Sequence, residues 1–185
     1  MNKFLVSVVL IALLIVSCTK DKKQDPFQIN KQHIGLLTDS TQVKDLKLAF
    51  PSDSIVKNIT GDEFTGNSND IEIYDTSGKQ LLTLTPSQSL DSTAVITSIH
   101  ILDSRYKTDK NISTLSTFAD IKNNYKISGI STLINSIVVS VNEINATFTI
   151  DKKELPANLQ YNMDLKIEAV QIPDNAKIKY FMLYW

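Results

Sequence analysis

The sequence predicts an α+β protein in which a short helix followed by an antiparallel β-sheet occurs twice, as a tandem repeat. Three observations lead to this prediction. A helical pattern near residue 41 recurs near residue 116. Each copy is followed by alternating apolar and polar residues, the pattern of strands with one buried face. Each copy then closes on a strongly apolar segment, at residues 94–102 and 176–184.

The first element along the chain is an export signal. Lys3 supplies a positive charge, and residues 4–16 are apolar with one exception. This run is shorter than the roughly 20 residues of a membrane-spanning helix and has the length of a signal-peptide core. It ends in Ser17-Cys18, which resembles the lipobox of bacterial lipoproteins. The resemblance implies that residues 1–17 are removed and that Cys18 carries fatty acids such as palmitate as a membrane anchor.

Residues 18–31 are polar and charged, and we expect them to form a flexible tether between the anchor and the folded part. Signals that retain lipoproteins at the inner membrane place Asp directly after the cysteine, whereas this chain has Thr19. We therefore expect a cell-envelope protein at the outer membrane. Lys20-Asp21 partly resembles the surface-export signals of Bacteroidota lipoproteins, so the periplasmic and the surface side both stay open.

The first predicted repeat spans residues 32–107. The hydroxyl of Thr41 can cap its helix, which Pro51 ends. Three apolar residues at i, i+3 and i+7 share one face of this helix: Val43, Leu46 and Phe50. A hairpin is predicted at residues 70–74 and 80–85, before the closing strand.

The second predicted repeat spans residues 108–185. Its helix matches the first at an offset of 75 residues, with Ser116 as the capping residue. The matched apolar residues are Phe118, Ile121 and Tyr125. A hairpin follows at residues 136–141 and 146–150, and the closing strands match at an offset of 82. The extra residues fall near 165–171, where we expect an added or a longer strand.

This succession resembles a family of small bacterial envelope lipoproteins, the RpoE-regulated type. The shared pattern is a T-x-x-x-D-L helix ending near an aromatic residue, then β-rich sequence, then a second such helix. Residues 37–56 and 112–130 carry the resemblance, which implies a related fold over most of residues 32–185 and no catalytic residue. A looser fold analogy is the tandem helix-plus-sheet module of β-lactamase-inhibitor proteins and outer-membrane assembly lipoproteins, which bind proteins.

Composition argues against several classes of function. The formal net charge of −1 lacks the basic excess of a nucleic-acid-binding protein. With Cys18 as the only cysteine, the mature chain has no disulfide, thiolate metal site or catalytic thiol. His33 and His100 show no metal-ligand spacing, and no cofactor motif is present, so we expect neither a metal nor a cofactor.

Asp45 and Asp120 occupy matching positions in the two predicted helices. We interpret them as acidic residues favoured by the helix dipole in the first turn. The alternative is a pair of catalytic carboxylates, although the acidic residues as a whole lack the spacing that would indicate a two-carboxylate hydrolase.

The last six residues of the chain are rich in aromatic side chains. Both faces of the predicted final strand are apolar, which favours a central strand covered on both sides. The alternative is an exposed patch that contacts a partner, since aromatic residues are enriched at interfaces. The candidate interface residues are Tyr180, Phe181, Tyr184 and Trp185.

Three Asp-Ser triplets match the acceptor pattern of Bacteroidota O-glycosylation, at Ser40, Ser54 and Ser92. Asp and Ser are also frequent in turns and helix caps, so the same residues have a purely structural interpretation.

These features together predict a lipid-anchored, non-enzymatic lipoprotein of the envelope that acts as a protein-binding or structural module. Its expected partners are the membrane, through the lipid, and an envelope protein. The alternative is a small-molecule or glycan binder, which needs a concave pocket with a few polar groups. An envelope hydrolase is the third possibility.

Overall fold

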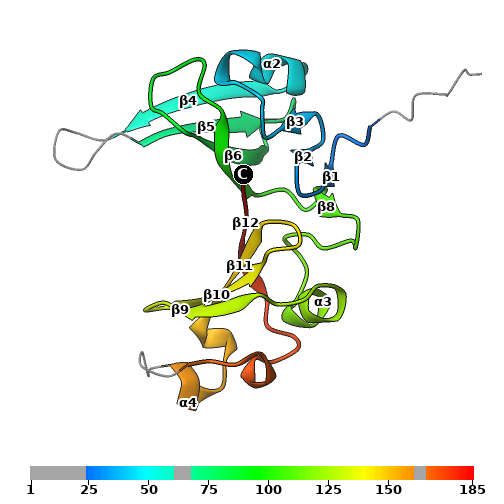
Figure 1. Cartoon of the computed structure of the whole chain (residues 1–185), viewed down its shortest axis with the longest axis vertical. Coiled ribbons are helices and arrows are strands. Elements are labelled where there is room, and N and C mark those ends of the chain that lie inside the picture. The colour runs from blue at the N-terminus through cyan, green and yellow to red at the C-terminus, as the bar shows by residue number, and fades with distance from the viewer. Residues whose placement is uncertain (1–23, 61–67, 161–165) are drawn as a thin grey trace, which may run out of the picture.

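The structure is a computed structural model that describes residues 24–60, 68–160 and 166–185. The predicted signal peptide, Cys18 and Thr19 lie outside the described residues. The protein is α+β and mainly β, with a few short helices, a large antiparallel sheet and a small four-stranded sheet (Figure 1). The predicted α+β class is confirmed at this level.

Eight strands form the large sheet, and every neighbouring pair is antiparallel. They are β4 (Ser54–Thr60), β5 (Ser68–Tyr74), β6 (Gln80–Pro86), β7 (Ile96–Ile101), β9 (Gly129–Thr132), β10 (Ser136–Val141), β11 (Ala146–Asp151) and β12 (Ile178–Tyr184). The spatial order is β4-β5-β6-β7-β12-β11-β10-β9. Both predicted hairpins and both closing strands are present, and the closing strands β7 and β12 pair at the middle of the sheet.

The predicted helices are short. The first is a 3-10 turn at Val43–Asp45 that continues into α2 (Leu46–Ala49), and the second is α3 (Phe118–Asn124). In Figure 1 both lie on the same side of the large sheet, α2 beside β4–β6 and α3 beside β10–β12. The predicted apolar faces are confirmed, because all six of their side chains are buried: Val43, Leu46, Phe50, Phe118, Ile121 and Tyr125.

The predicted capping residues are wrong by one position. The N-caps are Gln42, without a side-chain bond, and Thr117, which forms a capping box with Asp120. Thr41 and Ser116 instead close the turn before each helix. The Thr41 Oγ1 accepts a hydrogen bond from the N–H of residue 38 at 2.9 Å, and the Ser116 Oγ accepts one from the N–H of residue 113 at 3.1 Å.

Matching backbone hydrogen bonds attach each helix to the segment before its closing strand. The Val43 N–H donates to the Ala94 carbonyl at 2.9 Å, and the Phe118 N–H donates to the Ala176 carbonyl at 2.9 Å. The next N–H of each helix bonds in the same way, from Lys44 to the Ser92 carbonyl and from Ala119 to the Asp174 carbonyl, both at 2.9 Å. These bonds satisfy donors that a helix start otherwise leaves free.

A small sheet packs between the two helices (Figure 1). Its strands are β1 (Gln28–Ile29), β2 (His33–Ile34), β3 (Leu37–Thr38) and β8 (Lys107–Thr108), in the order β3-β2-β1-β8. The predicted tether is therefore too long at its C-terminal end, because Ile29 is buried in this sheet. The predicted boundary at residues 107 and 108 falls inside β8. Gly35 is required in the turn, since its φ is +54° and a Cβ there would lie 2.2 Å from a backbone oxygen.

One hydrophobic core fills the space between the large sheet, the helices and the small sheet. Residues 152–160 and 166–177 extend this core after β11 through a 3-10 turn (Lys152–Glu154), α4 (Ala157–Gln160) and a second 3-10 turn (Ala169–Gln171). The strand expected near 165–171 is wrong for its described part. Glu168 and Gln171 form a capping box that favours a helical turn there. In the described part of the chain, no helix is long and apolar enough to cross a membrane.

Candidate functional site on the open face of the large sheet

The large sheet has one face against the core and one face directed away from it, which we call the open face. Side chains alternate between the two faces along each strand. On the inner strands the open face is rich in hydroxyl groups, and none of its side chains there is fully buried. Its residues on β6, β7, β11 and β12 include Thr83, Thr85, Ser98, His100, Thr147, Thr149, Tyr180, Met182 and Tyr184.

The centre of the open face carries four larger side chains, which we call the seam cluster: His100, Tyr180, Met182 and Tyr184. They lie where β7 and β12 pair, with His100 opposite Met182. The rings of His100 and Tyr180 meet edge to face, with centroids 5.3 Å apart. Tyr180 and Tyr184 are each 44% exposed. Exposed aromatic and methionine side chains are typical of surfaces that contact other proteins.

The electrostatics of His100 favour contact over proton transfer. Burial lowers the pKa of this imidazole, which keeps it neutral at neutral pH. Glu72 is the carboxylate in the row of paired residues that runs from His100 across the strands. It lies two strands from His100, which corresponds to about 10 Å at the usual spacing between strands. Glu72 already accepts a hydrogen bond from the Tyr74 hydroxyl at 2.7 Å. His100 therefore has no carboxylate in that row close enough to orient it as a general base.

The four candidate interface residues do not share one surface. Tyr180 and Tyr184 lie on the open face, whereas Phe181 is fully buried in the core, its ring 4.6 Å from that of Phe148. Trp185 packs partly against the core, and its indole N–H has no hydrogen-bond partner in the described chain. The exposed tyrosines also show that the expectation of a strand covered on both faces is wrong.

A β-bulge in β12 changes the expected alternation. Thr149 pairs with Tyr180 and Ile150 pairs with Ile178, so Lys179 is an extra residue in the ladder. Ile178 consequently faces the core, although a regular strand would place it with Tyr180. A single sequence does not reveal such a bulge, because the residues on either side of it still read as strand.

The three predicted glycosylation residues, Ser40, Ser54 and Ser92, are exposed and lie at turns or at a strand start. Turn chemistry is present as well: Asp91 accepts hydrogen bonds from the N–H and the hydroxyl of Thr93 at 2.8 and 2.7 Å. Both interpretations are compatible with this geometry, and O-glycosylation stays a prediction.

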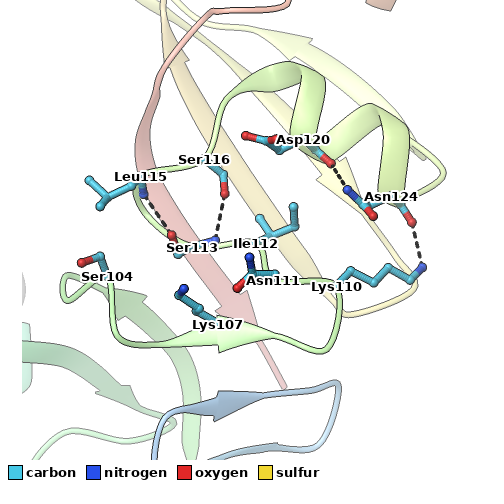
Figure 2. A pocket seen from close by; sticks show the side chains of 10 residues that line it. All are labelled: Ser104, Lys107, Lys110, Asn111, Ile112, Ser113, Leu115, Ser116, Asp120 and Asn124. Carbon is cyan, nitrogen blue, oxygen red and sulfur yellow. Dashed lines mark hydrogen bonds between the residues drawn. The ribbon is translucent and has the colours of Figure 1, made fainter.

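A polar pocket of about 450 Å³ lies between β8 and α3 (Figure 2). Two of its charged groups are already engaged in the fold. Lys110 donates to the Asn124 carbonyl at 2.8 Å and pairs with Glu143 at 2.7 Å. Asp120 accepts from the N–H of Thr117 at 2.7 Å in the capping box of α3. No pattern in the sequence indicates this pocket, because its lining comes from a loop and a helix that only the fold brings together.

A buried charge cluster lies just before β8, around Asp103. Asp103 is fully buried and pairs with Lys79 at 2.8 Å and Arg105 at 3.0 Å. Arg105 also pairs with Asp75 at 2.8 Å and lies over the ring of Phe27. Burial alone would raise the pKa of Asp103, but the hydrogen bonds from Arg105 and Lys79 lower it to about 2. This cluster joins a hairpin turn to the N-terminal segment, and no spacing in the sequence indicates it.

Among the described residues, no group of three or more His, Cys, Asp or Glu is placed to hold a metal ion. Asp45 lies in the 3-10 turn before α2, whereas Asp120 lies in α3. These two elements lie beside different halves of the sheet.

No protein-family model and no curated protein matches the chain. Among solved structures, the fold is similar to the crystal structure of the uncharacterized protein yfeY from Escherichia coli. The two share 13% sequence identity with a TM-score of 0.58, and the match covers 85% of this chain and 99% of that chain. At this level of identity the similarity shows the fold alone.

Proposed function

We propose that the protein is a lipid-anchored envelope lipoprotein that binds another envelope protein through the open face of its large sheet. The observation that carries the proposal is the seam cluster. Its two half-exposed tyrosines lie with a methionine and a neutral histidine on the sheet face that is directed away from the core. Tyr side chains supply large contact areas at low entropic cost and are frequent energetic centres of interfaces.

The anchor rests on the sequence, since Lys3, residues 4–16 and Cys18 follow the order of a lipoprotein signal. Two or three acyl chains would hold the protein at the membrane, with the outer membrane favoured by Thr19. We also propose that the protein belongs to the RpoE-regulated type of envelope lipoprotein. Replacing Cys18 by Ala should abolish incorporation of labelled palmitate and leave an unprocessed precursor, whereas labelled lipid on the variant would refute the anchor.

A paired set of variants tests the binding proposal. The double variant Tyr180→Ser, Tyr184→Ser removes the exposed rings without touching the core face of β12. The matched control is Leu48→Ser on α2, because Leu48 is 77% exposed on the opposite side of the sheet. After capture from the native envelope, a partner held by the wild type and the control but lost by the double variant supports the proposal. A partner held equally by all three contradicts it.

The second candidate is a small-molecule or glycan binder, and the pocket in Figure 2 favours it. Its hydroxyl, amide and ammonium groups are suited to the hydroxyl groups of a sugar. Ser113 and Ser116 line the pocket but use their hydroxyls in the turn before α3, at 3.3 and 3.1 Å. A glycan that protects this loop from hydrogen exchange, with no change on β12, would favour this candidate over the first.

We further propose that the chain arose by duplication of one helix-plus-sheet unit. The mirrored strand order, the matched helix faces and the matched helix-to-strand hydrogen bonds support this. In this account the two units join edge to edge through β7 and β12. A relative with a single unit should form a symmetric dimer through that strand, and a monomeric single unit with a stable sheet would count against the proposal.

A further inference from the structure

A cavity of about 550 Å³ lies where β11 and β12 meet the turn between β9 and β10. Three lysines line it, Lys152, Lys153 and Lys179, together with one carboxylate, Asp151. We call it the lysine cavity. Its positive lining contrasts with the chain as a whole, whose formal net charge is −1.

Lys152 is the unusual member of this group. Lys152 is only 3% exposed, and its Nζ has no hydrogen-bond partner within the described chain. Its backbone is fixed, because the Lys152 N–H donates to the Asn135 carbonyl at 3.0 Å. An ammonium group has three N–H donors, and burying it without acceptors is strongly unfavourable. Among the described residues, Lys152 therefore lacks an acceptor, which a bound ligand can supply.

Lys179 reaches the cavity because of the β-bulge in β12. In a regular strand Lys179 would alternate with Tyr180 and point toward the core, whereas the bulge exposes both. Its Nζ lies 3.3 Å from Asp151, and the Nζ of Lys153 lies 3.7 Å from the same carboxylate oxygen. One carboxylate is thus shared by two ammonium groups, and Lys152 has no anionic partner among the residues that the structure describes.

We propose that the lysine cavity binds the phosphate group of a small soluble ligand. A phosphate supplies several charged acceptor oxygens, so one phosphate can accept hydrogen bonds from more than one lysine of the cavity. The cavity is larger than an inorganic phosphate ion, which fits a phosphate carried on a larger molecule such as a sugar. In Figure 1, α4 and the N-terminal described residues lie toward opposite ends of the molecule, which favours a soluble ligand over a headgroup of the anchoring membrane.

The test uses the full chain purified in a non-ionic detergent, with inorganic phosphate as the probe and calorimetry as the readout. Lys152→Met keeps the length and apolar stem of the side chain and removes its charge. It should weaken phosphate binding about tenfold or more, as expected for losing a hydrogen bond to a charged group. Lys177→Gln is the matched control, since Lys177 is exposed directly before β12 and does not line the cavity.

A third variant changes affinity in the opposite direction. Asp151→Asn removes the carboxylate that competes with phosphate for Lys179, so phosphate should bind more tightly than to the wild type. Vesicles containing phosphatidylglycerol, compared with phosphatidylcholine alone, distinguish the source of the phosphate: Lys152-dependent binding to the anionic vesicles would assign it to a lipid headgroup instead of a soluble ligand. Absence of phosphate binding by the wild type, or equal binding by wild type and Lys152→Met, overturns the site.

Discussion

At Asp103, burial disfavours the charged carboxylate, whereas the neighbouring cations favour it. Its carboxylate is fully buried, and two cations, Lys79 and Arg105, compensate for the lost hydration. Breaking a buried ion pair by removing one partner typically costs about 3 to 5 kcal/mol, because the remaining charge stays buried. Lys79 and Arg105 are partly exposed, which lets water hydrate them and places any loss at the lower end of that range.

The cluster around Asp103 predicts a specific loss of stability in acid. The pKa of Asp103 in the folded protein is about 2, below its ordinary value of 3.8. A carboxyl with a lowered folded-state pKa stabilises the fold fully above its unfolded pKa, and this contribution is lost as the pH falls through the folded value. We expect Asp103 to contribute about 2 kcal/mol at neutral pH, lost mainly between about pH 4 and pH 2.

Urea unfolding of the wild type and of Asp103→Asn across this pH range checks the prediction. The difference in unfolding free energy between the two proteins should be largest near neutral pH and shrink toward pH 2. Other carboxylates contribute to the acid response of both proteins equally, so only the difference is diagnostic. A difference that stays constant with pH would show that Asp103 is not ionised against Lys79 and Arg105 in the folded state.

Phe181 lies within β12 and Trp185 directly follows it, and their replacement should affect the stability of the protein very differently. Phe181 is fully buried against Phe148, and truncating such a side chain to Ala costs about 3 to 5 kcal/mol. Trp185 is only partly buried at the end of the chain, where residues fray. We therefore expect Phe181→Ala to lower the melting temperature markedly and Trp185→Ala to lower it far less. Equal effects in thermal unfolding would contradict this placement of β12.

At the scale of elements, the two helices are held differently. In α3, the Thr117 side chain and Asp120 form a capping box, while the corresponding Gln42 before the first helical turn makes no side-chain bond. Thr117→Ala should therefore destabilise the protein by about 1 kcal/mol. Gln42→Ala, at the equivalent position, should have little effect. Chemical denaturation of both variants measures this contrast, and a larger loss for Gln42→Ala would contradict it.

The sequence predicted the elements whose patterns are local. The i, i+3, i+7 spacing at Val43 and Phe118 located both helices, and alternation at residues 70–74 and 136–141 located both hairpins. The strands of the small sheet are two residues each, too short for any periodicity to reveal. The order of strands in the large sheet depends on pairings between distant segments, which local spacing does not encode.

The candidate site was predicted only in part, for the same reason. Aromatic crowding near the C-terminus drew attention to β12, but the faces of individual residues depend on the bulge at Lys179. Phe181 was thus grouped with Tyr184 although one is in the core and the other on the open face. Lys152 gave no signal at all, because a lysine directly after a strand is normally exposed.

At the scale of the whole molecule, the two faces of the large sheet differ: one is covered and the other is open. The helices, the small sheet and residues 152–160 and 166–177 cover one face and form a single core. The open face is left with hydroxyl groups and the seam cluster. The N-terminal segment enters on the covered side, through the small sheet (Figure 1). In the proposed anchored protein, the lipid would therefore hold the covered side and leave the open face accessible to a partner.

Site-specific photo-crosslinking in the native envelope tests this account most directly. A photoreactive residue is placed at position 184 on the open face and, in a second protein, at position 48 on the outer side of α2. Both positions are exposed, at 44% and 77%, so accessibility alone favours position 48. If the open face binds a partner, we expect a discrete crosslinked protein from position 184 and none from position 48. A discrete product from position 48 alone, or from neither position, would contradict the claim that the open face is the binding surface.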